Sequence, residues 1–132
     1  MKLNHVANRL HPRHFETVVE MLKVKLGFIE LRRTDRSIWL RQPGANVDLQ
    51  FSHSDTSHRD ADKLRSQVSF LSETPRAALA DLAAWAQMRG LEASVGSYSE
   101  REFYLNASQA FVDFVIEAMT PDLADYNAEG QQ

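Results

Sequence analysis

Hydrophobic and polar residues alternate along several short stretches of the chain and recur at wider spacing along two longer ones. Val47, Leu49 and Phe51 are separated by polar residues, a period of two that predicts a half-buried strand over 47–52. The stretch 2–8 alternates in the same way. The strands predicted in this way, or from short extended segments bounded by turn residues, span 2–8, 28–33, 37–41, 47–52, 67–71, 91–95, 102–105 and 111–117.

Two longer segments show the spacing of a helix with one apolar face. Pro12 suits the first turn of the first helix, and Gly27 supplies a left-handed stop. Pro75 and Gly90 take the same places in the second helix. The two apolar stripes consist of Phe15, Val18, Val19, Leu22 and Leu26, and of Leu79, Leu82, Ala83 and Ala86.

The same order of elements occurs twice, at an offset of about 63 residues, because each proline precedes its glycine by 15 residues. Two copies are too few for a solenoid, so we expect two half-domains within one domain. The predicted fold is α+β, with two tandem βαβββ modules forming a curved, cup-shaped mixed sheet and helices on its outer face. The modules cover about 2–52 and 66–118, with a linker at 53–65 and a tail at 119–132.

One helix per module can cover only one face of its sheet, so the other face should be polar. The repeat makes His5 equivalent to Gln67, at an offset of 62, and Asp48 equivalent to Asp113, at an offset of 65. If the two sheets curve toward a common axis, these four side chains converge in one cup. Each is a possible ligand for a borderline or hard metal ion.

Composition narrows the classes of function. The chain has 132 residues, of which 43% are hydrophobic and 25% charged, as is usual for a globular protein. The net charge of −3 disfavours a nucleic-acid partner, and the lack of cysteine excludes disulfides and thiolate chemistry. Without a signal-like or membrane-spanning apolar run, we expect a cytoplasmic protein with no membrane partner.

Several short segments of the sequence, by their order and spacing, resemble those of one known family. They are LNHVA at the start, VKLGF at the end of the first helix, NVDLQF, SQVSFL and FYLNASQAFVDFVIE. Together with the βαβββ repeat, they resemble the vicinal oxygen chelate superfamily over about residues 2–118. That superfamily includes glyoxalase I, methylmalonyl-CoA epimerase, extradiol dioxygenases and the fosfomycin and bleomycin resistance proteins.

The resemblance implies where a metal would bind. Family members that bind a metal take one ligand from the first strand and one from the last strand of each module, which here match His5, Asp48, Gln67 and Asp113. Gln67 stands where His is usual, and the two Asp stand where Glu is usual. The implied cofactor is Ni, Zn, Co or Mn, or no metal at all. Of these four positions, only the one at His5 has an imidazole side chain, which disfavours the two-histidine iron site of a dioxygenase.

Other residues of the polar face are candidates for substrate contact. Trp39 and Tyr104 each precede a repeated Asp by nine residues, and they form either an aromatic wall or ordinary core. Arg41 could bind an anionic group. Gln50 and Ser69 share the predicted face, and Gln50 could replace Asp48 as a ligand.

The linker residues His53, Asp55, His58 and Asp60 match no established ligand spacing, so a solvated loop is expected.

Three functions fit this pattern. In the first, a metal polarises two substrate oxygens and stabilises an enolate, as in an isomerase, epimerase or lyase, while Asp48 or Asp113 moves the proton. The second is a metal-free protein that binds a ligand or drug, like the resistance proteins. The third is a dimerisation or regulatory module. The resemblance implies a homodimer, in which the cup forms within one chain or between two.

Overall fold

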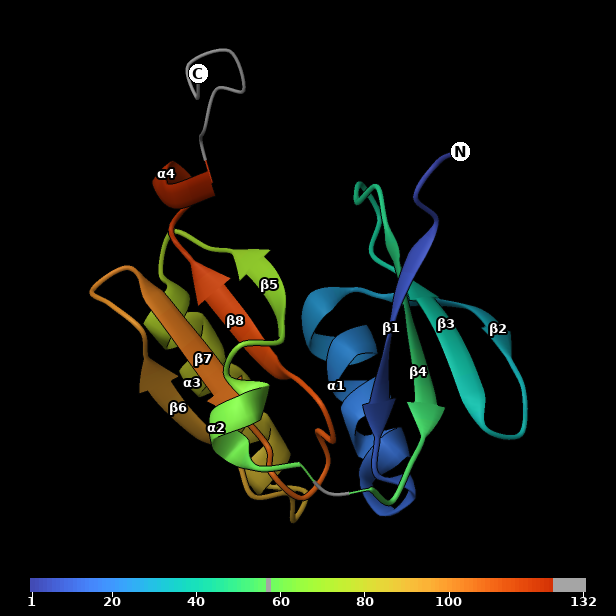
Figure 1. Cartoon of the computed structure of the whole chain (residues 1–132). Helices are drawn as coiled ribbons and strands as arrows, with labels where there is room; N and C mark the ends of the chain where they lie inside the picture. The colour runs from blue at the N-terminus through green and yellow to red at the C-terminus, as the bar shows by residue number, and fades with distance from the viewer. Residues whose placement is uncertain (57, 125–132) are drawn as a thin grey trace.

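The computed structural model describes residues 1–56 and 58–124 (Figure 1). The first module consists of β1 (His5–Leu10), a 3-10 turn η1 (Pro12–His14), α1 (Phe15–Leu26), β2 (Ile29–Arg33), β3 (Ser37–Arg41) and β4 (Asp48–His53). A short helix α2 (Asp60–Lys63) leads to β5 (Gln67–Leu71), α3 (Pro75–Gln87), β6 (Ser94–Ser97), β7 (Glu102–Asn106), β8 (Val115–Met119) and α4 (Pro121–Ala124).

The signals that delimit the first helix act as predicted. Pro12 opens η1, which leads directly into α1. Gly27 ends α1 with φ +72°, a left-handed conformation that costs least for glycine, and its N–H donates to the carbonyl oxygen of Lys23. The chain therefore turns into β2 where the sequence predicts it.

Each module forms a four-stranded mixed sheet, in the orders β1-β4-β3-β2 and β5-β8-β7-β6. The first strand of each module pairs in parallel with the last, and the other pairings are antiparallel. In each module the helix lies on one face of the sheet, and polar side chains alternate onto the other. The predicted α+β class, with two modules that each form a mixed sheet, is confirmed.

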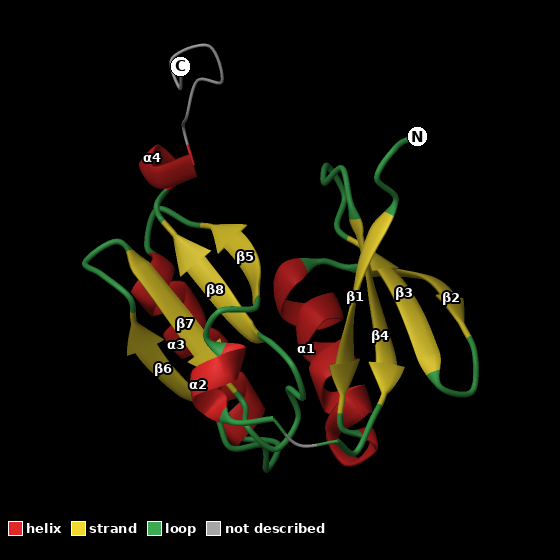
Figure 2. Cartoon of the chain, viewed as in Figure 1, coloured by secondary structure: helices red, strands yellow, loops and turns green. Residues whose placement is uncertain are grey.

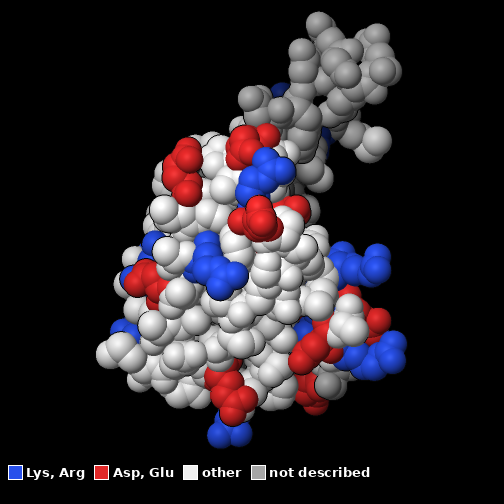
Figure 3. All heavy atoms as spheres, turned by 90° about the vertical axis from the view of Figure 1, so that its left-hand side faces the viewer, with Lys and Arg blue, Asp and Glu red and all other residues white. Residues whose placement is uncertain are grey.

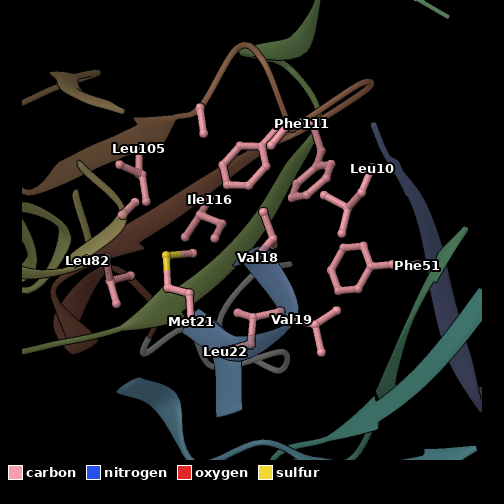
Figure 4. Close-up of a cluster of buried hydrophobic side chains, with 14 of the residues drawn as sticks. Leu10, Val18, Val19, Met21, Leu22, Phe51, Leu82, Leu105, Phe111 and Ile116 are labelled. Carbon is pink, nitrogen blue, oxygen red and sulfur yellow. The ribbon is translucent and has the colours of Figure 1, made fainter. Parts of the chain in front are cut away.

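One apolar core serves both modules. In Figure 1, α1 lies between the two sheets, and Figure 4 shows Met21 and Leu22 of α1 between Phe51 of β4 and Ile116 of β8. The rings of Phe51 and Phe114 lie 5.6 Å apart, which joins the apolar faces of the two sheets directly. Because both apolar faces point inward, the polar face of each sheet lies on the outside of the molecule.

The segment before β8 differs from the prediction of a strand over 111–117. Only Phe111 makes a bridge, to Leu10, and its ring stacks on Phe114 at 4.6 Å. These apolar side chains fill the space between the modules, so their alternation reflects burial in a loop. The regular strand begins at Val115, four residues later than predicted.

The linker and the tail each contain a short helix. Figure 2 shows α2 in front of the second sheet and α3 behind it, and α3 packs against β6, β7 and β8. The predicted tail begins with α4, and its residues 125–132 lie outside the described part of the chain.

Charged residues of both signs are interspersed on the side of the molecule shown in Figure 3, with no continuous basic surface. Among the described residues, no helix has the length and apolar character needed to cross a membrane.

Candidate functional site

The register of the first sheet places five polar or aromatic residues on its outer face. His5 pairs with Asp48 across β1 and β4, and Trp39 on β3 pairs with Gln50. Directly paired residues point to the same side of a sheet, and Arg41 lies two residues beyond Trp39 on that side. We call His5, Trp39, Arg41, Asp48 and Gln50 the first half-site.

Asp48 is held by an arginine. Nε and Nη2 of Arg41 donate to its two carboxylate oxygens at 2.8 and 3.0 Å, and the Asp48 side chain is only 10% exposed. The hydrogen bonds from Arg41 lower the pKa of Asp48 below its ordinary value. Asp48 therefore stays ionised, and both oxygens that were predicted to bind a metal or move a proton already have a partner.

The other members of the first half-site are more open. His5 is exposed, and its Nδ1 lies 2.8 Å from the side-chain oxygen of Asn4. Trp39 is half-buried, and the guanidinium of Arg32 lies over its ring at 5.2 Å. Trp39, predicted to belong either to an aromatic wall or to ordinary core, thus lies on the outer face with Arg32 over its ring.

The second sheet carries an equivalent group. Glu117 on β8 pairs with Ser69 on β5 and with Tyr104 on β7, so all three share the outer face. Gln67 lies two residues before Ser69 on the same side, and Tyr98 lies 5.0 Å from Tyr104 between ring centroids. We call Gln67, Ser69, Tyr98, Tyr104 and Glu117 the second half-site.

Glu117 was not among the predicted site residues. It is 8% exposed, and across residues 1–56 and 58–124 no hydrogen bond or ion pair reaches its carboxylate. A signal for it exists in the sequence, because it is the one charged residue in the apolar stretch 114–119. Its place on the outer face, beside Ser69 and Tyr104, makes it a candidate site residue.

The aromatic part of the second half-site is held in place by the backbone. The Tyr104 ring lies against Gly96, where an added Cβ would overlap it. The Tyr98 hydroxyl donates to the carbonyl oxygen of Leu64, and Nε2 of Gln67 donates to the same oxygen at 2.8 Å. Burial raises the pKa of Tyr98, and the negative charge of Glu117 adds to this.

The linker forms one wall of the second half-site, which the sequence did not predict. Lys63 of α2 is 3% exposed, and its Nζ donates to Oδ1 of Asn106 at 3.2 Å and to the carbonyl oxygen of Phe111 at 2.9 Å. It also pairs with Asp60 at 3.1 Å. Because Leu64 follows Lys63, this anchor fixes the carbonyl group that Tyr98 and Gln67 share.

Asp113 lies away from both half-sites. Its oxygens accept hydrogen bonds from the backbone N–H of Arg9 at 3.0 Å and from Nε of Arg9 at 2.9 Å. The guanidinium of Arg9 also contacts His58 at 3.1 Å. Asp113 therefore joins the end of β1 to the loop before β8, a connection between the modules.

The equivalence of Asp48 and Asp113 does not hold in the structure. Six residues (42–47) separate β3 from β4, but eight (107–114) separate β7 from β8, so an offset taken along the sequence shifts by two. The sheet pairing of Trp39 with Gln50 and of Tyr104 with Glu117 makes Gln50 the counterpart of Glu117.

The structure does not bring His5, Asp48, Gln67 and Asp113 into one hollow. No group of three His, Asp or Glu side chains in the described part of the chain lies close enough to hold a metal ion. A cavity of about 260 Å³ lies where the edges of the two sheets approach each other. Gln67 and Ser69 reach it, but it is otherwise lined largely by apolar side chains such as Val6 and Leu49.

No family model and no curated protein matches the sequence. Among solved structures, a possible glyoxalase from Bacillus cereus is 16% identical, with 90% of this chain and 98% of that chain covered and a TM-score of 0.59.

Two fosfomycin resistance proteins are also similar. FosX from Listeria monocytogenes, complexed with Mn(II) and sulfate, is 9% identical over 90% of this chain and 89% of that chain, with a TM-score of 0.59. FosX from Mesorhizobium loti is 12% identical over 98% and 96%, with a TM-score of 0.57. The predicted resemblance is confirmed at the level of the fold, because this chain has the fold of the possible glyoxalase and of the FosX proteins.

Proposed function

We propose that the protein binds a small organic molecule on the polar faces of its sheets without a divalent metal. The observation that carries this proposal is the pairing of both predicted carboxylate ligands. Asp48 is bonded through both oxygens to Arg41, and Asp113 is bonded through both oxygens to Arg9. A metal ion would have to break a charge-assisted pair at either position.

The remaining donors make a poor site for a borderline metal. They are His5, Gln50, Gln67 and Glu117, which is one imidazole, one carboxylate and two amides. Zinc, nickel and cobalt sites rely on imidazole, thiolate and carboxylate ligands. The amide of Gln67 is also oriented by its hydrogen bond to Leu64. The residues present therefore do not fit the metal that the fold family implies.

The binding proposal includes a homodimer. The two half-sites lie on outer faces of one chain, so a ligand that touches both Trp39 and Tyr104 would lie between two chains. The first half-site of one chain would then face the second half-site of its partner, and a dimer would contain two such cups.

Complementation tests this arrangement. A heterodimer of a Trp39→Ala chain and a Tyr104→Ala chain keeps one intact cup, because the two changes fall in the other one. We expect the mixture to regain ligand binding that each homodimer lacks. Sedimentation that shows only monomers at binding concentrations would contradict the shared cup.

A thermal-shift experiment tests the metal-free proposal. A ligand that binds only the folded protein raises its melting temperature. Chelator-treated protein is melted with Ni, Zn, Co and Mn separately and with a panel of aromatic and charged small molecules. We expect the melting temperature to rise with at least one small molecule and with none of the metals. The same experiment is repeated with the variant Glu117→Gln, for which Glu73→Gln is the matched control.

The Mn(II) in the FosX structure favours a second candidate, a metal-dependent isomerase, epimerase or lyase. The same experiment decides between the two. A rise of several degrees with one metal, lost in Glu117→Gln and kept in Glu73→Gln, would support the metal-dependent enzyme and contradict our first proposal.

A further inference from the structure

The second half-site contains an unbalanced charge. Glu117 is 92% buried (8% exposed), lies on the outer face of the sheet and has no cationic partner among the described residues. The two other carboxylates considered for the site, Asp48 and Asp113, each have an arginine. Among the described residues, the only buried side-chain N or O atom without a partner is Oγ1 of Thr120, so the carboxylate oxygens of Glu117 still reach solvent and can pair with a bound cation.

The side chains around Glu117 suit an organic cation. Tyr104 is its direct neighbour on β7, and the Tyr98 ring lies 5.0 Å from that of Tyr104 with a tilt of 54°. Aromatic faces attract ammonium groups and also pack against apolar ligand atoms. The only lysine of α2, Lys63, has its ammonium directed to Asn106, Phe111 and Asp60.

The aromatic and amide side chains of the second half-site are held in place by neighbouring groups. Gly96 leaves the space in which the Tyr104 ring lies, and Leu64 fixes both Tyr98 and Gln67 by accepting their hydrogen bonds. Little side-chain freedom remains to be lost when a ligand binds, which favours affinity.

We propose that the second half-site recognises the ammonium group of an organic amine, with Glu117 as the charge partner and Tyr98 and Tyr104 as the aromatic faces. This inference rests on the proposed function, because it names the class of ligand for that site. A metal ion is distinguished from such an amine by its lack of an apolar body for the tyrosines.

Three probes of one shape test the charge. Benzylamine is protonated at neutral pH, benzyl alcohol is neutral and benzoate is anionic. Each is titrated into the full chain by calorimetry, and the Tyr98 and Tyr104 resonances are followed by NMR. We expect benzylamine to bind at least about tenfold more tightly than benzyl alcohol, and benzoate to bind most weakly.

The matched variants assign the preference to one residue. Glu117→Gln should reduce the ratio of benzylamine to benzyl alcohol affinity to about one, while the exposed Glu73→Gln should keep it. The inference would be overturned if the two affinities are about equal in the wild-type protein, or if the preference for benzylamine is retained in Glu117→Gln.

The outcomes separate this inference from the proposed function. If benzyl alcohol or benzoate shifts the Tyr104 resonances and benzylamine does not, the small-molecule site stands and the amine inference fails. If none of the three probes binds, the amine inference fails, and the wider ligand panel decides whether the site binds small molecules at all.

Discussion

The two modules share strand order, register and the position of a helix, yet their polar faces differ. In the first module the acidic residue, Asp48, is neutralised by Arg41, and the face around it is open. On the polar face of the second module the acidic residue is Glu117, which has no partner among residues 1–56 and 58–124 and lies beside two tyrosines and a wall supplied by α2. A duplicated backbone thus preserves positions, while the partner of each side chain decides what it can do.

The two modules should unfold together, and a change in their shared core should cause the largest loss of stability. Phe51→Ala removes a ring from the core between the sheets and should cost about 3–5 kcal/mol of the free energy of unfolding. Because that core is shared, Trp fluorescence and circular dichroism should report one transition in urea. Val24→Ala, at an exposed position of α1, is the control. Two separate transitions would show that the modules fold apart.

A smaller loss of stability is expected when the Lys63 anchor of α2 is removed. Lys63→Met leaves Asn106 and the carbonyl group of Phe111 without their donor, at a cost of about 1–3 kcal/mol. Lys25→Met, which removes a more exposed lysine, should cost less. Equal melting temperatures for the two variants would mean that α2 is not held by this contact.

A comparable effect is expected at Gly96. Gly96→Ala places a Cβ in the space of the Tyr104 ring and should cost about 1–3 kcal/mol through overpacking. The double variant Gly96→Ala/Tyr104→Ala removes the ring, so it should be less destabilised than the sum of the two single changes. Additive losses in a double-mutant cycle would rule out the clash.

The smallest effect is the pH dependence of the Arg41–Asp48 pair. The pKa of Asp48 is lowered in the folded protein by its hydrogen bonds with Arg41. The pair therefore stabilises the fold fully at a pH above the pKa of Asp48 in the unfolded chain, which is about 4. That stabilisation is lost as the pH falls through the lower, folded pKa. The difference in stability between the wild-type protein and Asp48→Asn should be constant above about pH 5 and shrink on further acidification. A difference that grows in acid would contradict this pairing.

Much of the fold could be predicted because it depends on local signals. Gly27 ends α1 where only a left-handed residue fits well, and the strands Ser37–Arg41 and Gln67–Leu71 have the predicted bounds. Alternation of apolar and polar residues also identified which residues share the polar face of each sheet, among them His5, Gln50 and Ser69, although that face was expected to line a cup and lies on the outside of the chain.

The site was less predictable because it depends on contacts between distant residues. The role of Asp113 follows from Arg9, which is 104 residues away, and the arithmetic of the repeat could not reveal a loop longer by two residues. The burial of Lys63 also lies beyond composition, since lysine is usually exposed. Glu117 falls on the polar face that the alternation predicts, but the constant offset from Trp39 and Tyr104 pointed to Asp113, because the sequence does not reveal the longer loop before β8.

We propose that Glu117, and not Asp113, is the carboxylate that serves the small-molecule site. Calorimetric titration of benzylamine into Asp113→Asn and Glu117→Gln, at a temperature where both remain folded, tests it most directly. We predict that Asp113→Asn loses stability but keeps the wild-type affinity, while Glu117→Gln loses about tenfold or more in affinity. Loss of binding in Asp113→Asn together with wild-type binding in Glu117→Gln would show that Asp113, and not Glu117, serves the site.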